Sequence, residues 1–167
     1  YEQDYFTIPE PVIMGEATRV MSLRNGEQKM SKSAESDMTR INLTDDADMI
    51  AKKIRKAKTD SDPLPETVEG LEDRAEAKNL LTIYAALNDE SLQDVVARYV
   101  GQDFSGFKKD LVDLSVAKLA PITTRMSELL AHPDEIDKVL VQGTEKARVI
   151  AEKTKQDVYD IVGFWKC

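Results

Sequence analysis

The chain has 167 residues, of which 41% are hydrophobic and 32% are charged; this composition is typical of a soluble globular protein and excludes a wholly disordered one. The single cysteine, Cys167, excludes an internal disulfide framework and a cysteine-based zinc site, and it fits a reducing compartment, with the cytoplasm as the expected location. The 23 basic and 31 acidic residues give a formal charge of −8, so any nucleic-acid partner has to be held by a local basic surface.

The first 28 residues contain short β-prone runs separated by proline and glycine. The runs are Tyr5–Ile8, Val12–Met14 and Val20–Leu23, and a turn is expected at Arg24–Gly26. Because an isolated strand pair is marginal in water, we expect these runs to belong to a sheet whose other strands lie outside this chain, which predicts a chain truncated at its N-terminus. No signal peptide and no apolar run of roughly 18 residues is present, so we expect no membrane partner.

Two lysines and two serines follow this turn in the lysine-serine segment, Lys29-Met30-Ser31-Lys32-Ser33. Two ammonium groups, two hydroxyl donors and flexible backbone amides, with no carboxylate among the five residues, can hold an anion such as a phosphate. Lysine and serine are also common in ordinary exposed loops. The composition of the segment alone therefore leaves both interpretations open.

From about residue 45 onward the apolar residues recur at helical spacing. The predicted helices cover residues 45–58, 72–87, 92–100 and 104–131, a short helix from Pro133 and a last helix from Thr144. Pro121 predicts a kink or a break near residue 120, and Gly143 is expected to end the short helix. The expected fold class is therefore mainly α, with a bundle of helices joined by short connections.

Several basic residues on these helices are candidates for RNA binding. They are Lys52, Lys53, Lys56, Lys108, Lys109, Lys146 and Arg148. In the first predicted helix the acids come first and the bases last, an order that complements the helix dipole. A solvated charged face and an RNA-facing surface are therefore both open interpretations of this helix.

The lysine-serine segment spells the second ATP motif of class I aminoacyl-tRNA synthetases, and its surroundings resemble the tryptophanyl-tRNA synthetase family of the bacterial type. The resemblance covers nearly the whole chain, with matching segments in the expected order. They are Pro9–Ile13, Val20–Leu23, Lys52–Ala57, Thr59–Ser61, Asn79–Tyr84, Phe107–Leu111, Pro121–Ile122 and Glu145–Arg148.

This resemblance implies that residues 1–40 end a truncated Rossmann-like α/β catalytic domain and carry its KMSKS loop, and that residues 41–167 form a helical domain that binds the tRNA anticodon. It implies activation of tryptophan by ATP with Mg²⁺, and transfer to tRNA(Trp), by a cytoplasmic homodimer. Lys32 and Lys29 are then the expected catalytic residues. The ATP contacts are expected at Val20, Lys29, Met30, Ser31, Lys32 and Ser33, although Val20 is equally well explained as a buried strand residue.

Three features depart from the family pattern, one of which is the stretch Arg74–Lys78 before Asn79. Ala34–Asp37 replaces the acid and proline that usually follow the loop, and the lone histidine, His132, lies in the helical region, so the family's first, histidine-containing nucleotide motif is absent. We therefore expect the tryptophan pocket to lie mostly outside this chain and the chain to be inactive by itself. The alternative is a stand-alone helical RNA-binding or scaffold module with a relic loop; an upstream reading frame with the first motif would exclude it.

Overall fold

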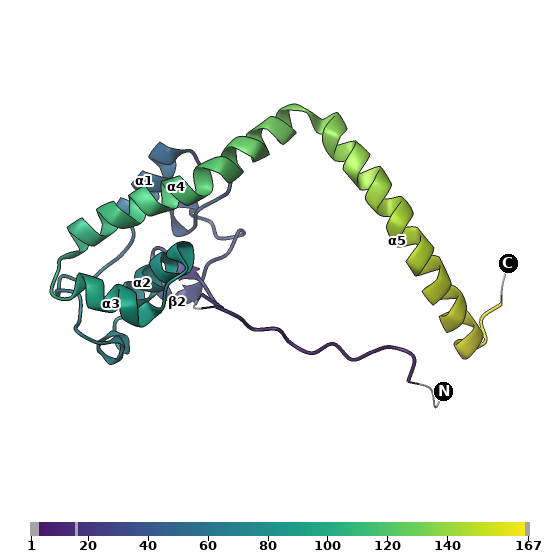
Figure 1. Ribbon diagram of the computed structural model, residues 1–167, viewed down its shortest axis with the longest axis horizontal. Helices are drawn as coiled ribbons and strands as arrows, with labels where there is room; N and C mark the ends of the chain where they lie inside the picture. Colours follow the sequence, from purple (N-terminus) through teal and green to yellow (C-terminus); the bar gives the residue numbers. More distant parts are fainter. Residues whose placement is uncertain (1–3, 16, 166–167) are drawn as a thin grey trace. The chain divides into compact units, whose positions relative to one another are not determined.

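The computed structural model describes residues 4–15 and 17–165. The described residues form two compact units, one of Ile13–Ser127 and one made from the described parts of Tyr1–Val12 and Glu128–Cys167. The larger unit contains a small antiparallel hairpin and the helices α1 to α3 with most of α4, and the smaller unit contains α5 (Figure 1). The mainly helical fold class that the sequence predicted is confirmed.

The hairpin consists of β1 (Met21–Ser22) and β2 (Asn25–Lys29), paired so that Met21 lies opposite Lys29. The turn is one residue earlier than expected, because Asn25 and Gly26 belong to β2. Residues 5–8 and 12–14 have no regular structure. They were expected to pair with strands outside this chain, so their assignment as strands stays a prediction. Their apolar side chains are exposed, with Ile8 at 88% and Val12 at 81%, and the described residues offer them no neighbouring strand.

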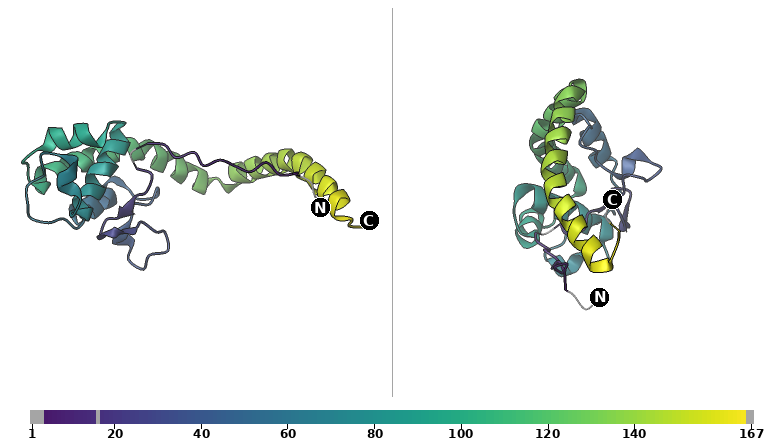
Figure 2. Two further views of the ribbon diagram at one scale, coloured as in Figure 1. Left: turned by 90° about the horizontal axis from the view of Figure 1, so that it is seen from below. Right: turned by 90° about the vertical axis from the view of Figure 1, so that its right-hand side faces the viewer.

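Two helices of the larger unit begin at side-chain caps. The Asp46 carboxylate accepts a hydrogen bond from the Met49 amide and starts α1 (Ala47–Arg55), and the Ser91 hydroxyl accepts one from Asp94 and starts α3 (Leu92–Tyr99). The 3₁₀ turn η1 (Asp37–Thr39) precedes α1, whereas the 3₁₀ turn η2 (Val68–Leu71) and α2 (Ala75–Asn88) lie between α1 and α3. Helix α2 packs on both β2 and α3 (Figure 2), so it connects the hairpin to the rest of the unit.

The core of this unit is centred on three aromatic rings. Tyr84 of α2, Tyr99 of α3 and Phe107 of α4 pack with ring centroids 5.0 to 5.9 Å apart, and Phe107 is fully buried. Apolar residues from α1, α2 and the start of α4 surround the rings. The contacts join three separate helices, so the aromatic cluster fixes the helical frame that carries the hairpin.

Helix α4 (Phe104–Ala131) continues through Pro121 without a break (Figure 1). The sequence predicted a kink or a break near residue 120, and the break is absent. Pro121 removes the donor that would bond to the carbonyl of Ala117, but both residues are exposed, so water can reach that carbonyl.

The prediction of two helices after residue 132 is wrong, because Pro133–Val162 forms one helix, α5. Gly143 and Thr144 lie inside it. The apolar positions before and after Gly143 keep one helical phase, and a glycine in a helix interior costs only about 1 kcal/mol, too little to end a helix whose neighbours continue the pattern. Within this unit the Tyr5 hydroxyl donates a hydrogen bond of 2.8 Å to Asp157 of α5.

Two glycines with opposite surroundings give a matched stability test. A methyl group on Gly26 would lie 2.5 Å from the backbone nitrogen of Glu76, whereas one on Gly143 would meet no atom within 4 Å. We expect Gly26→Ala to lower the free energy of unfolding by about 1 to 3 kcal/mol through overpacking, and Gly143→Ala to raise the stability of its unit by roughly 0.5 to 1 kcal/mol. Chemical denaturation checks both, and equal effects of the two substitutions would contradict the close approach of β2 to α2.

Candidate functional site: the lysine-serine segment and its supports

The lysine-serine segment begins at the last residue of β2 and leaves the hairpin as a tight turn. The Met30 amide donates a 3.0 Å hydrogen bond to the Val20 carbonyl, which extends the hairpin by one bond beyond β1. The Ser31 hydroxyl accepts a bond from the Ser33 amide at 3.2 Å, and the Ser31 carbonyl accepts one from Ala34 at 3.3 Å. Residues 31–34 therefore fold back on themselves, as serine-initiated turns do.

The side chains of this segment divide into an exposed set and a packed one. Lys29, Ser31, Lys32 and Ser33 are exposed, whereas Met30 is partly buried against the core. Met30 and Val20, for which the resemblance implied ATP contacts, are joined by their backbones, and Val20 is also partly buried. Met30 thus holds the segment against the core, and the ammonium groups of Lys29 and Lys32 remain in solvent.

The hairpin below the segment is held by Asn79 of α2, a buried polar residue. Its side-chain oxygen accepts a hydrogen bond from the Met21 amide at 2.9 Å, and its side-chain nitrogen donates to the Met21 carbonyl at 2.9 Å and to that of Ser22 at 3.4 Å. Sequence reasoning did not identify this role. The available signal was an amide residue next to Leu80 and Leu81, in a helix with an apolar face.

Glu76, at the start of α2, binds Lys58, which follows α1, at 2.7 Å. The hydrogen bond from Lys58 is the main cause that holds the pKa of the Glu76 carboxyl below its usual value, and a backbone bond from Gly26 of β2 contributes in the same direction. Leu23, in the hairpin turn, accepts a bond from the Lys58 amide at 2.8 Å. The hairpin, α1 and α2 are therefore tied together at this point.

The chain that leaves the segment is fixed by a cluster of charged residues around Lys53 of α1. The Lys53 ammonium group lies 2.5 Å from Asp45 and 2.6 Å from Asp37, and the Lys53 side chain is fully buried. Asn42 donates from its backbone amide to Asp45 and from its side chain to Asp37. Arg40 pairs with Asp37 at 3.1 Å. The two positive charges of Lys53 and Arg40 therefore neutralise the two negative charges of the aspartates in this cluster.

The position of Lys53 corrects the expectation of one exposed basic face on α1. Lys53 comes three residues after Ile50 and four before Ala57, and so lies on the buried face of the helix. Lys52 and Lys56 are exposed on the same helix. The sequence indicated this burial, because position 53 falls on the apolar face of the predicted helix. The basic residues around Lys53 favoured the interpretation as an exposed basic face instead.

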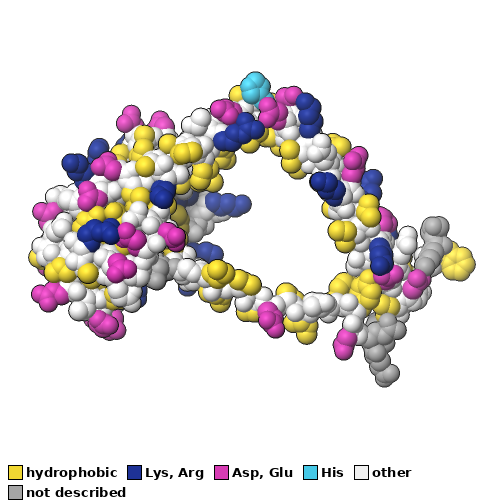
Figure 3. Space-filling model, in the orientation of Figure 1, with side chains coloured by type: hydrophobic (Ala, Val, Ile, Leu, Met, Phe, Trp, Pro, Cys, Tyr) yellow, Lys and Arg dark blue, Asp and Glu magenta, His cyan; other side chains and the backbone are white. Residues whose placement is uncertain are grey.

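The remaining basic candidates differ in their surroundings. Lys108 is partly buried; it donates to the Ala57 carbonyl at 2.8 Å and to the Thr59 hydroxyl at 3.2 Å. Burial first, and then the nearby Arg24, lowers the pKa of the Lys108 ammonium. Lys109 is exposed, as are Lys146 and Arg148 of α5. On the face shown in Figure 3 basic and acidic side chains are interspersed, so no single basic patch dominates it.

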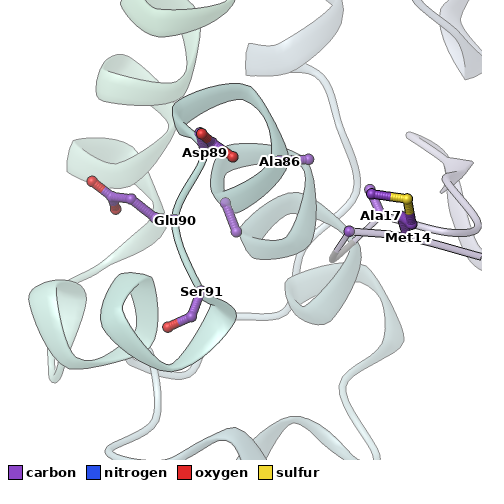
Figure 4. A pocket seen from close by; sticks show the side chains of 8 residues that line it. Met14, Ala17, Ala86, Asp89, Glu90 and Ser91 are labelled. Carbon is purple, nitrogen blue, oxygen red and sulfur yellow. The ribbon is translucent and has the colours of Figure 1, made fainter.

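A cavity of about 430 Å³ lies between residues 14–17 and the end of α2. Met14 and Ala17 line one side, and Ala86 and the α2–α3 connection, Asp89–Ser91, line the other (Figure 4). The Glu90 carboxylate is engaged by Arg98 at 2.7 Å. The cavity shares no residue with the lysine-serine segment, so it is a separate feature of the unit.

Chemically, the exposed segment can bind a polyanion. It presents two ammonium groups and two hydroxyls on a turn whose base is fixed, and it contains no carboxylate. Among residues 4–15 and 17–165, no group of three or more histidine, cysteine, aspartate or glutamate side chains could hold a metal ion. In the same part of the chain, no helix has the length and apolarity needed to cross a membrane.

Comparison with known proteins gives one consistent family. A sequence model described as "tRNA synthetases class I (W and Y)" matches residues 1–119. The chain is 58% identical to a tryptophan–tRNA ligase of Agrobacterium fabrum over 160 residues, which is 96% of this chain and 45% of the relative. It is 52% identical to one of Caulobacter vibrioides, covering 96% of this chain and 47% of the relative.

Solved structures agree with this family. A crystal structure of tryptophanyl-tRNA synthetase from Mycoplasma pneumoniae matches with a TM-score of 0.75 at 25% identity, over 90% of this chain and 47% of that one. The Campylobacter jejuni enzyme, complexed with ADP and tryptophan, matches with a TM-score of 0.61 at 28% identity, over 87% of this chain and 44% of that one. The chain thus spans about half the length of the relatives it matches. It belongs to the class I tRNA synthetases of the tryptophan and tyrosine family.

Proposed function

We propose that this chain supplies the ATP loop and the tRNA-binding helices of a tryptophan–tRNA ligase. In this proposal residues 1–40 end the catalytic domain and residues 41–167 form the anticodon-binding domain. The observation that carries it is the exposed pair Lys29 and Lys32, on a turn that the Met30–Val20 hydrogen bond joins to the hairpin. The choice of tryptophan over tyrosine is supported by relatives of 52 to 58% identity that are named tryptophan–tRNA ligases.

The reaction proceeds in two steps. A carboxylate oxygen of tryptophan attacks the α-phosphorus of ATP; the new acyl–phosphate bond forms as the bond to the bridging oxygen breaks, and pyrophosphate leaves. A terminal ribose hydroxyl of tRNA(Trp) then attacks the carbonyl carbon, and AMP leaves. In the first step negative charge builds on the pyrophosphate, so cations that contact it in the transition state accelerate the reaction.

Within this scheme Lys32 stabilises the leaving pyrophosphate and Lys29 binds the same triphosphate. The hydroxyls of Ser31 and Ser33 donate hydrogen bonds to phosphate oxygens. Val20 and Met30 lie on the adenine side and contact the base through backbone as well as side chain. Because Met30 is partly buried and the lysines are exposed, the segment can retain its base while its tip closes on the nucleotide.

Magnesium accompanies ATP in the proposed reaction. The lysine-serine segment has no carboxylate, and the described residues contain no cluster of three potential metal ligands. In this proposal the nucleotide phosphates therefore hold the ion, and this chain contributes the ammonium groups of Lys29 and Lys32.

The helical part contacts tRNA(Trp) in this proposal through exposed basic residues. The candidates with free access to solvent are Lys52, Lys56, Lys109, Lys146 and Arg148. Lys53 and Lys108 instead stabilise the protein interior around α1. Assembly as a homodimer and a cytoplasmic location complete the proposal.

The proposed activation step is tested by isotope exchange between pyrophosphate and ATP, catalysed by the complete product of the gene. We expect exchange that depends on tryptophan, with tyrosine at least about 100-fold less effective. The reason is that polar groups of a pocket built for one amino acid are left without hydrogen-bond partners when a different amino acid binds. Exchange driven by tyrosine, or by no amino acid of the standard set, would overturn the assignment.

A further inference from the structure

The buried ammonium group of Lys53 is the most unusual charge in the larger unit. Its side chain is fully buried and both carboxylates that neutralise it come from outside α1, Asp37 from η1 and Asp45 from the residues just before the helix. A buried charge destabilises a protein unless it is paired, so removing one partner of a buried ion pair leaves an unpaired buried charge and destabilises the fold. The ion cluster therefore constrains the position of η1 relative to α1.

The cluster reaches the lysine-serine segment through Arg40. The Arg40 guanidinium pairs with Asp37 and donates a hydrogen bond to the Ala34 carbonyl at 2.9 Å and one to the Ser36 carbonyl at 3.4 Å. Ala34 is the residue that immediately follows the segment. A continuous series of contacts thus runs from Lys53 through Asp37 and Arg40 to the end of the segment.

The two ends of the segment are consequently held by different structures. Met30 is held at the entrance by the hydrogen bond to Val20, and Ala34 is held at the exit by Arg40. Between them lie only Ser31, Lys32 and Ser33, all exposed. Lys32 can therefore move only as part of a three-residue tip whose two ends are fixed.

We infer that Asp37, Lys53 and Arg40 are positioning residues for the lysine-serine segment, which set where the Lys32 ammonium group lies when the nucleotide binds. They contact no substrate themselves. The inference rests on the proposed function of the segment as an ATP loop. A displacement of about 1 Å in a catalytic group can cost up to about 100-fold in rate, so loss of the exit anchor should be measurable in the activation step.

Asp37→Asn tests this inference, because asparagine keeps the shape of the side chain and removes its charge. Asp37 is half exposed, so the substitution leaves the packed core intact. Glu35→Gln is the matched control: it makes the same acid-to-amide change two residues away, at an exposed position for which the described residues show no ion pair or hydrogen bond. Asp37→Glu, which retains the charge, is the conservative variant.

The first measurement is limited digestion with trypsin, which cleaves after exposed lysines. We expect Asp37→Asn to raise the cleavage rate after Lys29 and Lys32 by about tenfold, the effect of losing one charge-assisted hydrogen bond. Cleavage after Lys52, in α1, serves as the internal reference for general loosening of the fold. The Glu35→Gln protein should be cleaved at the rate of the unchanged protein.

The second measurement is tryptophan-dependent exchange by the complete gene product. Asp37→Asn should lower kcat by about tenfold and leave the KM for tryptophan within about twofold, and Asp37→Glu should recover most of the loss. Unchanged cleavage after Lys29 and Lys32, a parallel rise after Lys52, or faster cleavage with unchanged kcat would each overturn the inference. Absence of exchange in the unchanged protein would instead overturn the proposed function, while the digestion would still test the anchor.

Discussion

Replacing Lys32 with alanine should lower the rate of tryptophan-dependent exchange by about 30- to 150-fold in the complete gene product. The reason is the loss of one charge-assisted contact to the leaving pyrophosphate, worth roughly 2 to 3 kcal/mol in the transition state. Because Lys32 is exposed at the tip of its turn and forms no ion pair among the described residues, its removal should not alter the fold. The effect should therefore appear in kcat, with a small change in the KM for tryptophan.

Lys52→Ala provides the matched control for this experiment. Lys52 is an exposed lysine of α1, proposed to contact tRNA, and the exchange reaction contains no tRNA. We expect its exchange rate to stay within about twofold of that of the unchanged protein. If Lys32→Ala behaved like Lys52→Ala, Lys32 would have no part in the activation step.

Replacing Phe107 with alanine should cost about 3 to 5 kcal/mol of unfolding free energy in the larger unit. Phe107 is fully buried and its ring contacts those of Tyr84 and Tyr99 at 5.9 and 5.0 Å. Truncation removes the apolar surface and leaves a cavity that three helices cannot close without moving. Denaturant titration followed by far-ultraviolet circular dichroism measures the change.

Phe164→Ala is the control for size and chemistry. Phe164 follows α5, is 63% exposed and contacts only the Tyr159 ring among the aromatic residues that the structure describes. Its replacement should change the unfolding free energy by less than about 1 kcal/mol. A loss for Phe107→Ala no larger than that for Phe164→Ala would contradict the aromatic cluster as the centre of the core.

The local features of the fold could be predicted from the sequence, because their causes are local. Asp46 and Ser91 have side chains that commonly cap helices, and helices begin directly after both. Gly101, a residue type common at helix ends, has a φ of 71° just after α3. Gly143 shows the limit of such reasoning. A glycine can end a helix, but here the apolar phase continues on both sides and the helix runs through it.

The supports of the candidate site could not be predicted, because they depend on contacts between distant parts of the chain. Asn79 binds Met21, 58 residues earlier, and no local pattern connects the two. Lys53 was grouped with its basic neighbours, although the helical spacing places it with Ile50 and Ile54 inside the unit. The positive charge of Lys29 and Lys32 was evident from residue type, whereas the structure that holds them required the tertiary fold.

Charging of tRNA decides whether this chain works in a tryptophan–tRNA ligase, as the proposed function requires. The measurement incubates the complete gene product with ATP, bulk tRNA and radiolabelled tryptophan or tyrosine, and follows label on the tRNA. We expect tryptophan to be attached in a reaction that requires ATP, and we expect Lys32→Ala to slow this reaction, if the proposed function is right. Attachment of tyrosine, or attachment of neither amino acid by an intact protein, would contradict it.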